Sequence, residues 1–277
     1  MQDNSNHFPI AIFAGRGQLP KVLIDDCLKK NRQFILFLLA GEHYEIDYSA
    51  FNPTIIGYGE VDKFLDKLSR HNISHLVFIG AVNKPNFSSL KVDKKGAILL
   101  SKIITNKILG DDAVLRTVVK FFEKEGLKIL RIDELLDCVI SSKSTITKIL
   151  PTPQNLIDIE IGSKAIKHFS KFDVGQSLVV SQKQIVAVEA LEGTDAMIQR
   201  CGNLKAEFLK NAILIKMKKA QQTTKADLPT IGVDTIKNCH QVNFKGIAIE
   251  VNNTIILDKS EVIKTADELG LFIIAIK

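Results

Sequence analysis

The sequence has no tryptophan and few aromatic residues, which make up 6% of its 277 residues. No basic run is interleaved with Tyr or Phe, the arrangement that stacks on the bases of nucleic acids. We therefore predict no nucleic-acid partner. The net charge of +6 is compatible with another anionic partner, such as a phosphate or an anionic lipid surface. The plain alternative is a general drift toward lysine that serves no partner.

Cysteines are also scarce, and none of the four belongs to a CxxC pair, so a zinc knuckle and a CxxC redox motif are not supported. The longest apolar run, residues 34–40, is far shorter than the roughly 20 residues of a membrane span. The polar start does not resemble a signal peptide. We expect a soluble, cytoplasmic protein in which the cysteines are reduced packing residues: Cys27, Cys138, Cys201 and Cys239.

Well-known catalytic templates are missing too, because the chain has no P-loop, no GxSxG and no HExxH. What is present is an alternation of short apolar strands and amphipathic helices through the first half. This order predicts an α/β fold, with a Rossmann-like parallel sheet in an N-terminal domain of residues 1–133. The expected strands are residues 9–14, 33–39, 54–58, 76–82 and 127–132, and the expected helices are residues 20–30, 60–71 and 112–125.

The second half indicates another α/β domain, with mixed strand directions. We expect a linker at residues 134–157, where Ser and Pro gather, and a C-terminal domain at residues 158–277. Two hairpins are predicted, one joining residues 177–181 to 185–189 and one joining residues 247–251 to 255–257. Strands at residues 212–217 and 271–276 and helices at residues 159–169 and 260–269 complete this expectation.

A glycine pair follows the first expected strand and precedes the first helix. Gly15 and Gly17, around Arg16, would let backbone N–H groups approach a phosphate near a helix N-terminus. Gly80 and Ala81 close the fourth strand at the same carboxyl edge, where open α/β sheets bind ligands. We therefore predict that these residues bind a nucleotide or a phosphate. The alternative is a tight turn.

A nicotinamide-dehydrogenase fingerprint is poorly matched. The third glycine of that fingerprint is replaced by Pro20, and Gly41 and Glu42 come slightly late for the acidic residue that ends its second strand. Asp111 and Asp112 open the helix at residues 112–125. An aspartate before a helix is usually a cap, but these two carboxylates could also hold a ribose or a metal.

Acidic and hydroxyl side chains gather after the first expected hairpin. Glu189, Glu192 and Asp195, with Thr194, exceed what a single helix cap needs. Further on, lysines suited to phosphate oxygens precede carboxylates suited to a hard divalent cation. These are Lys216, Lys218 and Lys219, followed by Asp227 and, just beyond, Asp234. Because the cationic and anionic groups are so close, we favour a site for phosphate and metal over a solvated loop.

Collinear blocks along nearly the whole chain carry a resemblance. The most specific are EGTDAM at residues 192–197 and DLPTIG at residues 227–232; others are residues 14–20, 80–85, 110–116, 173–176 and 188–190. With these blocks the chain resembles the UDP-2,3-diacylglucosamine pyrophosphatase family of lipid A biosynthesis. This is the type unrelated to the calcineurin-like metallophosphoesterases.

The resemblance implies a hydrolase that cleaves UDP-2,3-diacylglucosamine into UMP and 2,3-diacylglucosamine 1-phosphate. It implies magnesium, with manganese as an alternative, and a homodimer that is cytoplasmic and visits the inner-leaflet surface transiently. The catalytic residues would be Asp227, Glu192, Asp195 and Thr194, with Asp227 as a metal ligand. The nucleotide and phosphate residues would be Gly15, Arg16, Gly17, Gly80, Ala81, Asp111, Asp112, Lys216, Lys219, Gln222 and Lys225.

Two positions depart from the family pattern. Gln222 and Asp227 match it, but Thr223 stands where Asp is usual and Lys225 where Arg is usual. Thr223 lacks a carboxylate for metal, and Lys225 keeps its charge but loses the bidentate fork of Arg. Two other functions stay open: a nucleotide-sugar transferase or oxidoreductase, and a non-catalytic module that binds glycolipid phosphates, toward which Thr223 leans.

Overall fold

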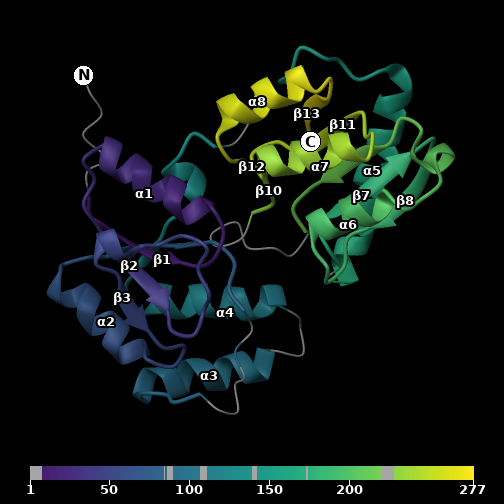
Figure 1. Cartoon of the computed structure of the whole chain (residues 1–277). Coiled ribbons are helices and arrows are strands. Elements are labelled where there is room, and N and C mark those ends of the chain that lie inside the picture. Colours follow the sequence, from purple (N-terminus) through teal and green to yellow (C-terminus); the bar gives the residue numbers. More distant parts are fainter. Residues whose placement is uncertain are drawn as a thin grey trace. The chain divides into compact units, whose positions relative to one another are not determined.

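The computed structural model describes residues 8–83, 85, 90–106, 111–138, 142–172, 174–219 and 228–277. The described chain forms two compact units, and the boundary between them falls between Asp137 and Cys138 (Figure 1). We call them the N-terminal unit and the C-terminal unit and describe each separately.

The N-terminal unit contains the predicted parallel sheet. Its strand order is β3-β2-β1-β4-β5, and every pair in it is parallel. The central strand is fully buried at Ile10, Ala11 and Ile12, as expected for a strand covered on both faces. The strands are β1 (Ile10–Ala14), β2 (Phe34–Leu39), β3 (Thr54–Ile56), β4 (His75–Ile79) and β5 (Lys128–Ile129).

Helices cover both faces of this sheet (Figure 1). One face carries α1 (Leu19–Lys29), and the other carries α2 (Val61–Arg70), α3 (Lys94–Asn106) and α4 (Asp111–Lys124). Three of the four helices match the prediction, and α3 was missed. Its buried hydrophobic side chains are Leu99 and Ile103, but Ile98 and Ile104 are more than half exposed. These exposed isoleucines weaken the polar–apolar contrast that identifies a helix in sequence.

The C-terminal unit contains a six-stranded sheet of mixed direction, in the order β6-β13-β11-β9-β7-β8. Three central strands are parallel, and β7 runs antiparallel to β9 and β8, which confirms the predicted mixture. The strands are β6 (Ser144–Thr145), β7 (Ser177–Ser181), β8 (Gln184–Val188), β9 (Ile213–Lys216), β11 (Gly246–Glu250) and β13 (Phe272–Ile276).

Four helices pack on this sheet. One face carries α5 (Pro153–Phe169), which buries Ile159 and Ile166. The other face is covered by α6 (Thr194–Cys201), α7 (Val233–Gln241) and α8 (Lys259–Glu268). Part of the segment expected as a linker is regular structure, because β6 and the first turn of α5 lie in it. Thr152 caps α5 by accepting the N–H of Asn155 at 3.2 Å.

One of the two predicted hairpins is confirmed and the other is wrong. Gln182 and Lys183 join β7 to β8 with φ values of 50° and 66°, which suit a tight hairpin. The second hairpin does not form, because β12 (Ile255–Ile256) pairs in parallel with β10 (Thr230–Ile231) instead of with β11. Both sides of β11 are already taken by β9 and β13, so the turn after it leads out of the sheet.

The four cysteines are buried and free, as predicted. Over the residues that the structure describes, no helix combines the length and the apolar character that crossing a membrane would require.

Backbone contacts tie the glycine loop after β1 to the end of β4. The N–H of Arg16 donates to the Ala81 carbonyl at 2.7 Å, and the N–H of Ala81 donates to the Arg16 carbonyl at 3.1 Å. A Cβ on Gly15 would overlap the carbonyl oxygen of Ala81. Glycine is thus required here for contact between two backbone segments.

We predict that Gly15→Ala lowers the free energy of unfolding by about 1–3 kcal/mol, because the added methyl group overpacks this contact. The matched control is Gly57→Ala, where the nearest atom to an added Cβ would be 3.4 Å away. Urea unfolding of the two variants measures the difference. Equal stability would show that the loop does not lie against Ala81 as described.

Candidate functional site

Four polar residues meet at one end of the C-terminal sheet. Lys216 ends β9 and is paired in register with Ser177, which begins β7. Glu189 directly follows β8, and its N–H donates to the Ser177 carbonyl at 2.9 Å. Gly193, at φ 82°, turns the chain into α6, whose first residue is Thr194. Strand register and one glycine turn therefore bring together side chains that are far apart in sequence.

The hydroxyl of Thr194 joins the other three side chains. It donates to Glu189 Oε2 at 3.1 Å and accepts from Lys216 Nζ at 2.9 Å. Ser177 Oγ lies 3.1 Å from it and donates, because the single hydrogen of Thr194 is committed to Glu189. One donation and two acceptances use the full capacity of a hydroxyl. Thr194 thus fixes Lys216 and Glu189 relative to each other.

Both charged members of this cluster are buried. Lys216 is 5% exposed and Glu189 is 7% exposed. Burial of an ammonium or a carboxylate is costly unless charge and hydrogen bonds compensate it, so their placement near each other is required. The arrangement provides a fixed positive charge that suits phosphate oxygens and a carboxylate that can accept a proton.

Glu192 has a different set of partners. Arg200 lies 3.1 Å from Glu192 Oε1 and also donates to the Val188 carbonyl at 2.7 Å. The N–H of Glu192 itself, with the Arg200 guanidinium, lowers the pKa of this carboxyl. A carboxylate with a lowered pKa is a weak base. In the described contacts, Glu192 fastens the loop after β8 and does not join the cluster.

Asp195 is likewise bonded elsewhere. It lies exposed in the first turn of α6 and accepts from the Asn238 side chain at 3.1 Å, which connects α6 to α7. Of the predicted catalytic set, the structure places Thr194 in the cluster and gives Glu192 and Asp195 these other contacts. Asp227 lies outside the described residues, as do Gln222, Thr223 and Lys225.

Two members of the cluster were not predicted as site residues. Glu189 belongs to the acidic segment that follows the first hairpin. Its position directly after a strand could have indicated a site residue. No sequence pattern singled out Ser177, because a serine at the start of a strand is common. Its role becomes visible only through its pairing with Lys216. Lys219 is half-buried three residues beyond Lys216.

Hard oxygen donors for a cation are present in this cluster, but they are few. Within the described parts of the chain, no three or more His, Cys, Asp or Glu side chains gather closely enough to hold a metal. Magnesium is commonly held by one or two carboxylates together with substrate phosphates and water. Glu189 therefore fits such an ion only if phosphate oxygens share the coordination.

The glycine loop of the N-terminal unit offers fewer amides than predicted. The N–H groups of Gly15 and Arg16 already donate to backbone carbonyls of the β4 segment, namely Ile79 and Ala81. The N–H of Gly17 faces a carboxylate oxygen of Glu45 at 3.4 Å. Asp111 and Asp112 begin α4, and their side chains lie outside the described part.

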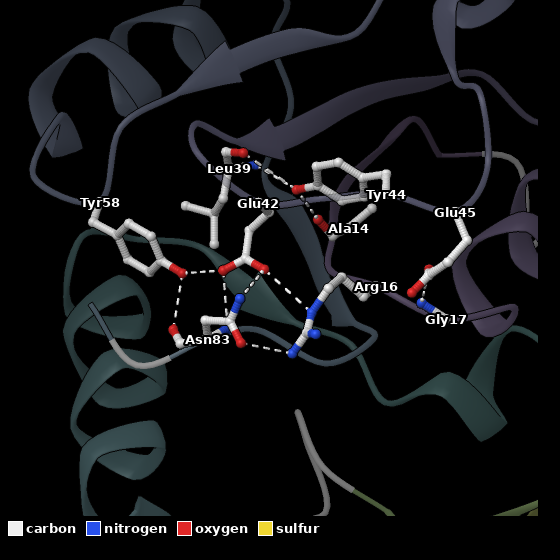
Figure 2. Close-up of polar contacts among 9 residues, drawn as sticks. All are labelled: Ala14, Arg16, Gly17, Leu39, Glu42, Tyr44, Glu45, Tyr58 and Asn83. Carbon is white, nitrogen blue, oxygen red and sulfur yellow. Dashed lines mark hydrogen bonds and ion pairs between the residues drawn. The ribbon is translucent and has the colours of Figure 1, made fainter. Parts of the chain in front are cut away.

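A polar network surrounds Arg16 at this edge of the sheet (Figure 2). The guanidinium forms an ion pair with Glu42, with 3.2 Å between Nε and Oε2, and donates to the Asn83 side chain at 2.9 Å. Sequence spacing suggested that Glu42 comes late for the end of β2. The structure nevertheless places it beside Arg16, because the turn at Gly41, with φ 84°, leads the chain back.

A hollow on the C-terminal unit, with a volume of about 620 Å³, lies away from the cluster. It is lined at the opposite ends of the strands by residues that include Lys210, Asn211 and Lys245. It is lined by none of the candidate site residues.

Comparison with known proteins agrees with this two-unit organisation. A family model of the LpxI N-terminal domain matches residues 9–139, and a model of the LpxI C-terminal domain matches residues 142–274. The chain is also 33% identical over 272 residues to the UDP-2,3-diacylglucosamine pyrophosphatase LpxI of Caulobacter vibrioides. That similarity covers 96% of this chain and 97% of the relative.

We predict that Thr194→Val lowers the free energy of unfolding by about 1–3 kcal/mol, because it leaves buried polar partners without their shared hydroxyl. The control is Thr235→Val in α7, whose hydroxyl accepts one long hydrogen bond, 3.4 Å from Gly232 N. Chemical denaturation of both variants provides the comparison. A Thr194 variant no less stable than the control would disprove the linking role of the hydroxyl.

Proposed function

The chain belongs to the LpxI family, and on that basis we propose that it hydrolyses the pyrophosphate bond of UDP-2,3-diacylglucosamine. The products are UMP and 2,3-diacylglucosamine 1-phosphate, and the reaction is a step of lipid A biosynthesis. The observation that best supports hydrolysis in this chain is the buried cluster of Lys216, Thr194, Glu189 and Ser177.

The cluster fits the requirements of phosphoanhydride hydrolysis. The diphosphate is anionic, so positive charge must offset it before water can approach a phosphorus atom. Lys216 supplies a fixed charge for the phosphate oxygens. Glu189 accepts a proton as water attacks, and the anhydride oxygen leaves on the departing phosphate with the electron pair of the broken bond. Thr194 and Ser177 hold the two charged groups in place.

The remaining predicted residues keep their proposed roles. Asp227 is proposed as a magnesium ligand or as the group that activates water, and Lys219, Gln222 and Lys225 are proposed to contact phosphate. Magnesium, or manganese in its place, would polarise the phosphate oxygens and offset their charge. In the described part of the chain, Glu189 is the carboxylate of the cluster, and it would share such an ion with substrate oxygens.

Membrane contact and dimer formation are also part of the proposal. A substrate with two acyl chains resides in a bilayer, so a cytoplasmic enzyme must meet the inner-leaflet surface at its periphery. Two apolar side chains of the C-terminal unit support this, because Phe172 is 80% exposed and Leu191 is fully exposed near Glu189 in the sequence. The net charge of +6 favours an anionic surface. The homodimer rests on the family resemblance.

The direct test incubates the purified protein with UDP-2,3-diacylglucosamine and magnesium and follows UMP release by chromatography. We expect UMP to appear, EDTA to stop its release, and added magnesium or manganese to restore it, because the anionic diphosphate needs a cation. No UMP at high enzyme concentration would refute the hydrolase. Undiminished turnover in EDTA would refute only the metal requirement.

A further inference from the structure

Of the two carboxylates drawn in Figure 2, Glu42 makes more polar contacts than Glu45, and its side chain is only 2% exposed. Its partners come from the segments that follow three strands of the parallel sheet. Arg16 follows β1, Tyr58 follows β3 and Asn83 follows β4, while Glu42 itself follows β2. All four therefore lie at the carboxyl edge, where open α/β sheets bind ligands.

Each carboxylate oxygen of Glu42 has two partners. Oε1 accepts from the Tyr58 hydroxyl at 2.5 Å and from the Asn83 N–H at 2.9 Å. Oε2 accepts from the Asn83 side-chain amide at 3.1 Å and lies 3.2 Å from Arg16 Nε. Burial and the carboxylate raise the pKa of Tyr58, so its hydroxyl remains a donor. With four contacts from three residues, the carboxylate of Glu42 has little capacity left for a ligand.

Arg16 is the member of this network that can still reach a ligand. Its Nη2 donates to Asn83 Oδ1 at 2.9 Å, and its buried Nε makes no hydrogen bond within the described chain but forms the ion pair with Glu42, so one edge of the guanidinium is held (Figure 2). Its side chain nevertheless keeps 34% exposure. A guanidinium fixed in this way loses little conformational freedom when it binds a phosphate.

A carboxylate of the protein already lies next to this loop. Glu45 Oε2 is 3.4 Å from the N–H of Gly17. Backbone N–H groups, of Glu45 itself and of Gly17, lower the pKa of this carboxyl, and Arg16 adds to the effect. Arg16 and the Gly17 amide thus attract an anionic oxygen, and the exposed Glu45 can move aside for another one.

We propose that Glu42, with Asn83 and Tyr58, is a positioning residue that holds the Arg16 guanidinium ready for a phosphate group of the nucleotide. We further propose that Glu45 occupies the place of that phosphate until the nucleotide binds. The inference rests on the proposed function for its choice of a uridine nucleotide. The fixed Arg16 side chain, with the amide of Gly17, then recognises the phosphate, since the amides of Gly15 and Arg16 already donate to backbone carbonyls.

Two carboxylates three residues apart provide the test, because the proposal assigns them opposite effects. UMP is titrated calorimetrically into the wild type, Glu42→Gln and Glu45→Gln. Glu42→Gln should raise the Kd about tenfold, since Arg16 loses its fixed orientation, and Glu45→Gln should lower the Kd severalfold. If Glu42 acted only through its charge, its removal would lower the Kd too, and that result would overturn the proposal.

A double-mutant cycle separates positioning from general loss of structure. Arg16→Met should raise the Kd at least tenfold, and Glu42→Gln should add nothing in that background, because a positioning residue acts only through its partner. Asp66→Asn, which breaks an exposed pair with Arg70 on α2, is the control and should leave the Kd unchanged. Additive effects of Arg16→Met and Glu42→Gln would overturn the positioning role.

Folding and function are controlled independently. Thermal midpoints accompany each titration, and Tyr58→Phe, which removes one donor from Glu42, takes the place of Glu42→Gln if that variant does not fold. It should raise the Kd severalfold. A wild type that binds UMP in an Arg16-dependent manner but releases none from the lipid substrate would contradict the hydrolase and support this inference. If the wild type is active and Arg16→Met leaves the Kd for UMP unchanged, the result would support the hydrolase and contradict this inference.

Discussion

One hydroxyl group, that of Thr194, links two buried charged side chains of the C-terminal unit, Lys216 and Glu189. The ammonium of Lys216 and the carboxylate of Glu189 lie where water is largely excluded, so each depends on partners placed by the fold. The register that pairs Lys216 with Ser177, together with the turn at Gly193, provides those partners. Fixed charges in a site of low polarity act more strongly on developing charge than solvated ones, which is what hydrolysis of an anionic diphosphate requires. One end of the mixed sheet therefore holds the charges on which the proposed hydrolysis depends.

In the N-terminal unit, too, a buried charged side chain depends on partners placed by the fold, here in the proposed nucleotide site. In dinucleotide-binding folds, glycine-loop amides hold the phosphates at the point where strand order reverses. Here that point lies between β1 and β4, and backbone hydrogen bonds between Arg16 and Ala81 cross it. The amides of Gly15 and Arg16 are thereby committed, and the Arg16 side chain is a partly exposed cation among the described residues at this edge. Glu42 is buried and saturated, so it can fix that side chain without competing for a ligand.

Elements that depend on a local residue pattern could be predicted from the sequence. Strand pairings and side-chain contacts that depend on residues distant in the sequence could not. Apolar runs identified the main strands of both sheets, while α3 was missed because the exposed Ile98 and Ile104 blur its polar face. The turn at Asn252 was consistent with a hairpin, but the partners of β11 are β9 and β13, and no local pattern reports that. Thr194 stood in a specific motif and was predicted. Ser177 and Glu42 acquire their roles only through residues brought to them by the fold, so spacing alone did not single them out.

The measurement that tests the central claim most directly is the turnover rate of Lys216→Met beside its thermal midpoint. If the buried ammonium stabilises the transition state, the rate of UMP release falls about 100-fold or more. Lys205→Met, at an exposed lysine of the same unit that lies 3.9 Å from Glu207, should stay near the wild-type rate. A folded Lys216→Met protein that keeps more than about a tenth of the wild-type rate would contradict the account, because a group so dispensable cannot supply the main positive charge.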